Sequence, residues 1–176
     1  MSEPRWLTDD EQRVWRAYAQ ASSLLQAHLE GQLQRESGMP HAYYEVLVAL
    51  SEADGRRLRM SELASVRASS RSRLSHAVAR LEAKGWVRRE SCPTDKRGSW
   101  AVLTDAGFAA LKEAAPGHVE AVRESLFDQL TAEQVRQLGE ISEAILAGLR
   151  PKCQAVREAE EAAEFAAPVV ELPKSG

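Results

Sequence analysis

The stretch that decides the fold runs from Met60 to Gly107 and reads MSELASVRASSRSRLSHAVARLEAKGWVRRESCPTDKRGSWAVLTDAG. Its first part predicts a short helix over SELASV that Ser61 can cap, because a serine side chain satisfies a free backbone N–H at a helix start. A longer helix follows, with Ser69 or Ser70 as its cap. Two consecutive helices of this kind, separated by a short turn, are typical of a helix-turn-helix.

The longer helix has two different faces. Apolar residues recur three and four positions apart and form one stripe: Leu74, Ala77, Val78 and Leu81. The other side is small, polar and basic, with Ser72, Ser75, His76, Ala79, Arg80 and Ala83. We therefore predict that one face packs, that the other faces outward, and that Gly85 ends the helix.

The periodicity changes after Gly85. Residues 86–91 and 99–103 are rich in β-formers, and the residues between them, 92–98, are typical of a turn. This pattern predicts a two-stranded hairpin with a charged tip, lying against the neighbouring helices because an isolated hairpin is marginally stable.

Helices are predicted on both sides of this stretch. A capping box at Thr8 to Glu11 opens a long amphipathic helix that ends at the Ser37 to Pro40 run, and a second helix covers His41 to Glu52, ending before Asp54-Gly55. Thr104 opens a helix to about Asp128, interrupted or bent around Pro116-Gly117. A capping box at Thr131 to Gln134 opens a last helix that ends at Pro151, and we expect a loosely ordered tail beyond it.

Positive charge is concentrated in the middle of the chain. Residues 56–104 contain twelve Lys or Arg and four Asp or Glu, although the formal net charge of all 176 residues is −3. A basic segment in an acidic protein is typical of a site for a polyanion, because neutralising phosphates releases counterions.

Composition excludes several other classes. A hydrophobic content of 44% fits a single globular domain, without an apolar run long enough to span a membrane. The acidic, polar start lacks the features of a secretory signal, so we expect a cytoplasmic protein. We find no phosphate-binding loop, nucleophile elbow or metal-ligand spacing, and Cys92 and Cys153 lie far apart, so we expect no enzyme, cofactor, metal site or disulfide.

Taken together, the segments SELA, SRS, RLEAKGWV, the Asp95-Lys96-Arg97 wing tip and LTDAG resemble the MarR family of bacterial transcriptional regulators. The resemblance spans nearly all of residues 8–149. It implies a mainly α fold with a small β-hairpin wing, in which a winged helix-turn-helix head sits inside a helical dimerisation frame. The corresponding boundaries are 1–36 for an N-terminal dimerisation helix, 37–104 for the DNA-binding head, 105–150 for C-terminal dimerisation helices and 151–176 for the tail.

The resemblance also implies a homodimer that grips the halves of a pseudo-palindromic duplex. The recognition helix would supply Ser70, Arg71, Ser72, Arg73, Ser75, His76 and Arg80. Arg73 and His76 are the candidates for base edges, because Arg can donate two hydrogen bonds to guanine. The wing would supply Arg88, Arg89, Asp95, Lys96 and Arg97, with Arg97 entering the minor groove and Asp95 orienting it.

Two further sets of residues follow from the same resemblance. The dimer interface would use Leu7, Val14, Leu130, Leu138, Ile145 and Leu149. A pocket for a small phenolic or carboxylate effector would use Trp15, Tyr18, His28, His41, Tyr43 and Tyr44. We thus expect a repressor released by such a ligand. The alternatives are a redox-responsive regulator acting through Cys92, or a protein-interaction module without specific DNA binding.

One segment departs from the family pattern. The turn before the recognition helix carries Arg67, Ala68 and Ser69, where the family has an apolar residue, a glycine and another apolar residue. We expect this difference to alter the tilt of the recognition helix.

Overall fold

The structure is a computed structural model that describes residues 3–66, 71–92 and 95–166. It is mainly helical with one small sheet, as predicted. The helices are α1 (Asp9–Ser37), α2 (His41–Glu52), α3 (Met60–Val66), α4 (Arg71–Ala83), α5 (Asp105–Ser125) and α6 (Ala132–Ala166), with short 3-10 turns at Asp54–Arg56 and Phe127–Gln129. The strands are β1 (Arg57–Arg59), β2 (Val87–Cys92) and β3 (Asp95–Leu103).

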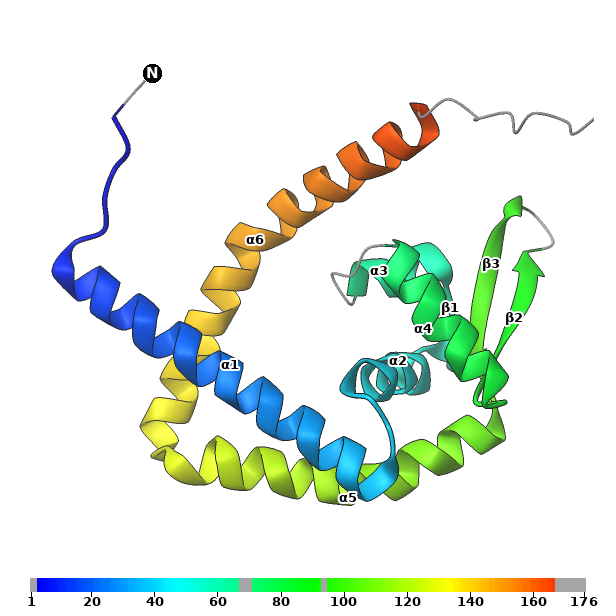
Figure 1. Ribbon diagram of the computed structural model, residues 1–176, viewed down its shortest axis with the longest axis horizontal. Coiled ribbons are helices and arrows are strands. Elements are labelled where there is room, and N and C mark those ends of the chain that lie inside the picture. Colours follow the sequence, from blue (N-terminus) through cyan, green and yellow to red (C-terminus); the bar gives the residue numbers. More distant parts are fainter. Residues whose placement is uncertain (1–2, 67–70, 93–94, 167–176) are drawn as a thin grey trace, which may run out of the picture.

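Figure 1 shows two parts of the molecule. A head contains α3, α4 and the sheet, and α1, α5 and α6 form a frame of long helices. Helix α2 lies between the two and packs on both. This is the predicted arrangement of a winged head attached to a helical frame.

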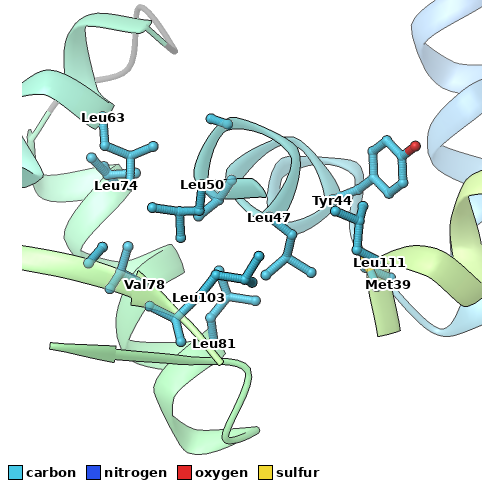
Figure 2. Close-up of a cluster of buried hydrophobic side chains, with 14 of the residues drawn as sticks. Met39, Tyr44, Leu47, Leu50, Leu63, Leu74, Val78, Leu81, Leu103 and Leu111 are labelled. Atoms are coloured by element: carbon cyan, nitrogen blue, oxygen red, sulfur yellow. The ribbon is translucent and has the colours of Figure 1, made fainter. Parts of the chain in front are cut away.

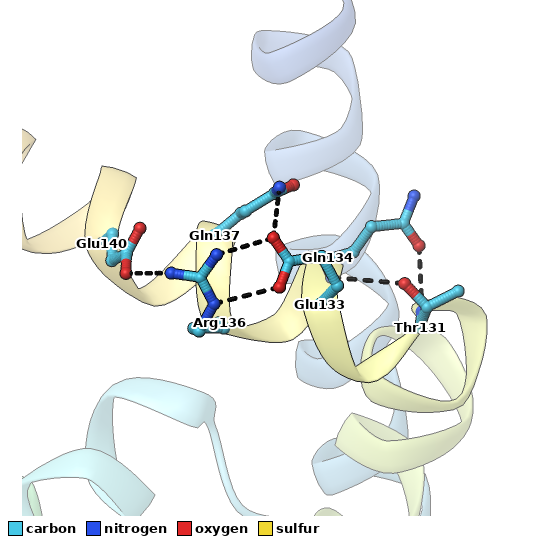
Figure 3. Close-up of polar contacts among 6 residues, drawn as sticks. All are labelled: Thr131, Glu133, Gln134, Arg136, Gln137 and Glu140. Carbon is cyan, nitrogen blue, oxygen red and sulfur yellow. Dashed lines mark hydrogen bonds and ion pairs between the residues drawn. The ribbon is translucent and has the colours of Figure 1, made fainter.

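Both predicted capping boxes of the frame are present. Thr8 Oγ1 accepts from the backbone N–H of Glu11, whose carboxylate accepts from the backbone N–H of Thr8. Thr131 and Gln134 form the same reciprocal pair at the start of α6, as Figure 3 shows. One turn further on, Arg136 bridges acidic residues on either side of it along the helix. These local bonds start α6 without help from other elements.

The start of α3 differs from the prediction. The helix begins at Met60, so Ser61 lies inside its first turn rather than at its cap. The carboxylate of Glu62 accepts from the backbone N–H of Arg59 and stabilises this end instead. The candidate caps Ser69 and Ser70, and the turn formed by residues 67–69, lie outside the described residues.

Helix α4 ends as predicted. Gly85 has a left-handed backbone with φ of 72°. Its N–H donates to the carbonyl of Glu82, and the N–H of Trp86 donates to the carbonyl of Leu81, which together form a Schellman motif. This turn sends the chain directly into β2.

The sheet has three antiparallel strands in the order β1-β3-β2. Strand β1 was not predicted, because three residues with two arginines carry too little pattern. The hairpin loop is also shorter than predicted: Cys92 pairs with Asp95, so Asp95, Lys96 and Arg97 belong to β3 rather than to a loop over 92–98. Strand pairing extends to this point because a two-residue connection suits a hairpin.

Helix α5 is tied closely to the start of the wing. Thr104 caps it by accepting from the N–H of Gly107, and its hydroxyl donates to the carbonyl of Gly85, 2.7 Å away. A Cβ at Gly107 would lie 2.1 Å from the carbonyl oxygen of Trp86, so only glycine fits here. Helix α5 continues through Pro116 without interruption, although Figure 1 shows it bending near its middle.

Helix α6 corrects the predicted boundary at Pro151. It continues through this proline to Ala166, where the sequence indicated a loosely ordered tail. The segment after Pro151 is rich in Ala and Glu, which are strong helix formers, and their preference carries the helix past the single missing N–H. Residues 167–176 lie outside the described residues.

The core is centred on α2. Figure 2 shows Leu47 and Leu50 facing Leu81 and Leu103 of the head, and Tyr44 lying at the other end near Leu111 of α5. The predicted stripe of α4 is part of this core, since Leu74, Val78 and Leu81 are buried. Because the same short helix packs against both parts, the core fixes the head relative to α5.

Candidate nucleic-acid interface

The outward face of α4 is the first component of the candidate interface. Ser72, Arg73, His76 and Arg80 are all exposed, whereas the apolar stripe lies on the opposite side. At about 100° per residue, these four side chains fall within an arc of roughly 100°. This arc is polar and basic. Ser70 lies outside the described residues, as does the side chain of Arg71.

The N-terminal end of α4 and the tip of the hairpin lie at the same end of the head (Figure 1). This follows from topology, because α4 runs away from that end and β2 returns to it after the Gly85 turn. The predicted wing residues Asp95, Lys96 and Arg97 occupy the start of β3, next to this tip. Their side chains are outside what the structure describes.

The two adjacent arginines of β2 point in opposite directions. Arg88 pairs across the strands with Val102 and forms an ion pair with Glu90 on the same face of the sheet. Arg89 pairs with the buried Ala101 and lies on the face toward α4. The sequence analysis assigned both arginines to the wing as DNA contacts, but successive residues of a strand alternate between faces.

Arg89 contacts α4 at two places. Its Nη2 donates to the carbonyl oxygen of Ser75 at 2.9 Å and lies 3.3 Å from Ser75 Oγ. Its Nε lies 3.2 Å from Glu82 Oε2, and its backbone N–H donates to Glu82 Oε1 at 2.9 Å. The predicted DNA contacts Ser75 and Arg89 therefore bind each other.

A large apolar surface remains exposed on the frame. Of the predicted interface residues, Leu7, Val14, Ile145 and Leu149 are exposed, and Leu130 and Leu138 are half-buried. Other apolar residues of α1, α6 and the segment before α1 are also exposed, and the sequence analysis did not assign them to an interface: Trp6, Leu24, Ile141, Leu146 and Val156. From residue 139 to 153 every residue of α6 is exposed. An apolar surface of this extent is typical of a protein interface.

The predicted effector residues separate into two groups. Trp15 and Tyr18 are exposed on α1, with their ring centroids 6.3 Å apart. His28 is exposed too, whereas Tyr43 is half-buried against the core. Trp15 lies about 25 Å along α1 from Gln32, where α1 meets the second group. The structure therefore does not bring the six residues into one pocket.

The second group gathers where α1, α2 and α5 meet. The ring of His118 lies 4.4 Å from that of Tyr44 and 5.5 Å from that of His41. His41 in turn faces Glu45, with 3.8 Å between Nδ1 and Oε1. Tyr44 is buried, which raises the pKa of its hydroxyl.

Two polar side chains of this junction were missed by the sequence analysis. Gln32 is 3% exposed and His118 is 9% exposed, yet Gln32 Oε1 and His118 Nδ1 have no hydrogen-bond partner among the described residues. Burial lowers the pKa of His118, and the nearby His41 lowers it further, while Glu45 acts in the opposite direction. No sequence pattern marks His118 on α5 or Gln32 on α1, since both become buried only when the helices pack in the fold.

Within the described residues, no group of three His, Cys, Asp or Glu side chains is arranged to hold a metal ion. Nor does any described helix combine the length and apolar character required to cross a membrane. Cys153 is exposed with a free thiol, and Cys92 is the last residue of β2.

A helix-turn-helix followed by a hairpin, with exposed polar and basic residues on the second helix, defines a winged helix-turn-helix protein. Comparison with known proteins agrees. A family model described as the MarR family matches residues 37–98. A MarR family transcriptional regulator from Streptomyces coelicolor, solved in complex with DNA, is 60% identical, with 85% of this chain and 93% of that one covered and a TM-score of 0.81.

AbsC, another MarR family regulator from Streptomyces coelicolor, is 43% identical, with 84% of this chain and 99% of that one covered and a TM-score of 0.79. The transcriptional repressor MprA of Escherichia coli is 25% identical over 115 residues, and the match spans 65% of each protein, less than two thirds of that repressor. The chain therefore belongs to the MarR family, which consists of transcriptional regulators and not of enzymes.

Proposed function

We propose that this MarR family regulator binds double-stranded DNA as a homodimer, with one head on each half of a pseudo-palindromic operator. The observation that carries the proposal is the exposed, basic arc of α4 beside the wing tip, at one end of a head with twelve Lys or Arg in residues 56–104. The related Streptomyces coelicolor regulator solved in complex with DNA supports the same function. Since the bound duplex would be chromosomal, the proposed site of action is the cytoplasm.

Each part of the head has a distinct proposed role. Arg73 and His76 read base edges in the major groove, and Arg80 extends the basic arc of α4. Ser70, Arg71 and Ser72 hold phosphates near the helix start. Arg97 enters the minor groove, oriented by Asp95, while Lys96 and Arg88 add positive charge.

The DNA-binding proposal is tested by selecting duplexes from a random-sequence library with the purified protein and measuring anisotropy on the recovered sequence. An inverted repeat with half-sites about one helical turn apart is the expected result. Arg73→Ala should relax the preference at one position in each half-site, whereas Arg97→Ala should weaken binding to many sequences. Identical preferences for wild type and Arg73→Ala would refute the role of Arg73.

The dimer proposal rests on the exposed apolar surface of α1 and α6. We assign Trp15 and Tyr18 to this interface rather than to a pocket, because they are exposed close to Val14 on the same helix. Ile145→Asp would bury a charge in the interface, so sedimentation velocity should show monomer where wild type is dimeric. Ala42→Asp, at an exposed position of α2 in the head segment 37–104, is the control. Equal dissociation of both variants, or none, would contradict the assignment.

We further propose that the protein represses transcription and is released by a small phenolic or carboxylate effector. Repression is supported by the names of two relatives, the repressors MprA of Escherichia coli and YetL of Bacillus subtilis. For the effector, the junction of α1, α2 and α5 offers an unpaired acceptor on Gln32 and an unpaired ring nitrogen on His118. A phenol hydroxyl can donate to Gln32 Oε1, and a phenol or carboxylate oxygen can accept from His118 when Nδ1 carries the proton. Buried polar atoms are costly when unpaired.

Benzoate and phenol are suitable probes of the effector site. Binding should raise the melting temperature of wild type and release the recovered duplex, and His118→Leu should lose both effects. Stabilisation that persists in His118→Leu would contradict this position of the site.

A further inference from the structure

We propose that Arg89 is a positioning residue that locks the wing to the recognition helix, and that it acts through Glu82 and Ser75 of α4 rather than by touching DNA. The inference rests on the proposed DNA binding and changes the role that the sequence suggests for Arg89. We call Arg89, Glu82 and Ser75 the wing latch.

The geometry of the wing latch spans two turns of α4. Ser75 and Glu82 are seven residues apart, so they lie on the same side of the helix about 10 Å from each other along its axis. Arg89 reaches both, with its guanidinium between Ser75 and Glu82 and its backbone N–H on Glu82. Contacts at two heights along one helix fix its angle to β2, whereas a single contact would leave it free to pivot.

The contacts involve two of the three guanidinium nitrogens of Arg89. Both Nε and Nη2 are engaged, and only about a third of the side chain is exposed (35%). Charged hydrogen bonds of this kind are stronger than neutral ones, so releasing Arg89 to a phosphate would break a formed network. The neighbouring Arg88 lies on the opposite face of β2, where it forms its ion pair with Glu90.

Glu82 provides a second, independent observation. It is one of four acidic residues in the basic segment 56–104, and it lies on the recognition helix itself. A carboxylate close to DNA opposes phosphate binding, so its presence calls for another role. Its Oε1 accepts from the backbone N–H of Arg89 and its Oε2 forms an ion pair with Nε of the same residue, which supplies that role.

The consequence concerns specificity. Major-groove contacts from α4 and minor-groove contacts from the wing must be made at the same time, at a spacing that the duplex fixes. Holding α4 and β2 at one angle pre-organises the major-groove and the minor-groove contacts together. Without the wing latch, the affinity for the specific duplex should fall more than the affinity for non-specific DNA.

The test uses the full-length protein and two duplexes, one recovered by wild type from a random-sequence library and a scrambled version of it. Affinities are measured over a series of salt concentrations for wild type, Glu82→Gln, Arg89→Gln and the double variant. Arg88→Gln is the matched control, because it removes one charge from the same strand without touching α4. Thermal melts confirm that each variant is folded.

We expect Glu82→Gln and Arg89→Gln each to reduce the preference for the recovered duplex by roughly ten-fold. The double variant should keep at least the preference of whichever single variant shows the smaller one, since both substitutions remove the same network. The salt slope of Arg89→Gln should equal that of wild type. Arg88→Gln removes a positive charge of the wing, so it should weaken binding to both duplexes alike and leave the preference between them unchanged.

A direct phosphate contact by Arg89 gives different results. Arg89→Gln would then lower the salt slope by about one, and Glu82→Gln would leave binding unchanged or tighter because it removes a negative charge. Either result overturns the wing latch. If a variant fails to fold, the charge swap Glu82→Arg with Arg89→Glu decides between the two roles. The swapped protein should recover part of the preference for the recovered duplex if Arg89 acts through Glu82, and should show a still smaller preference if Arg89 contacts a phosphate. Wild type that shows no preference between the duplexes refutes the proposed function itself.

Discussion

Replacing Gly107 with alanine should destabilise the protein strongly, because this glycine lies where α5 meets the wing. The added Cβ would lie 2.1 Å from the carbonyl oxygen of Trp86, 2.8 Å from its carbonyl carbon and 2.9 Å from Leu103 Cδ1. Two of these atoms are backbone, so no side-chain rotation relieves the clash. The start of α5 must move away from Trp86 by roughly 1 Å.

The movement also strains the capping bonds of Thr104. Its backbone N–H donates to Trp86 O at 3.0 Å, and its hydroxyl accepts from Gly107 N at 3.0 Å. Overpacking costs about 2 kcal/mol and a lost cap costs about 1 kcal/mol, so we expect a loss of about 3 kcal/mol in the free energy of unfolding. For a chain of this length the melting temperature should fall by roughly 10 °C.

Urea denaturation at a fixed protein concentration measures the change, because the stability of the proposed dimer would depend on concentration. The matched control is Gly139→Ala, since a Cβ there meets nothing within 4 Å. Alanine is the better helix former, so this variant should be stabilised by about 0.5 to 1 kcal/mol. A Gly107→Ala protein that unfolds at the same urea concentration as wild type would refute the reasoning.

Three further outcomes follow from the structure. Leu50→Ala empties a fully buried position (0% exposed) and should cost about 3 kcal/mol in urea denaturation, whereas Val119→Ala, at a position 54% exposed, should stay within roughly 0.5 kcal/mol of wild type. The lowered pKa of His118 means that the unfolded chain binds this proton more readily, so stability is retained above the ordinary value of 6.5 and lost as the pH falls through the folded-state pKa. Thermal melts from about pH 7.5 to about pH 5.5 should show this loss in wild type and a smaller one in His118→Gln, and parallel curves would contradict it. Thr131→Ala removes the cap of α6 and should lower stability by about 1 kcal/mol in chemical denaturation, with an unchanged midpoint as the contrary result.

Helices and their ends could be predicted from local patterns. The capping boxes at Thr8 and Thr131, the glycine turn at Gly85 and the apolar stripe of α4 are all encoded within a few residues, and each is present in the structure. The same local reasoning failed at Pro151, where the helix preference of the residues beyond it prevailed over one proline.

The candidate site was less predictable because its decisive features are long-range. Strand alternation separates Arg88 from Arg89, but the partner of Arg89 depends on how β2 docks against α4. Likewise, Gln32 and His118 lie on α1 and α5, far apart in the sequence, and become buried only when these two helices pack in the fold. The sequence also could not assign Trp15 and Tyr18 to the proposed effector pocket or to the proposed dimer interface. That choice depends on which end of α1 lies close to the head, and only the fold shows it.

Sequence-specific DNA binding is the central claim, and one titration tests it most directly. Fluorescence anisotropy of the wild-type protein is followed on the library-selected duplex and on its scramble across several salt concentrations. We expect a preference of roughly a thousand-fold or more for the selected duplex, with a log–log salt slope that reflects several phosphate contacts. Equal and weak binding to both duplexes would contradict the claim and favour a protein-interaction module built on the same fold.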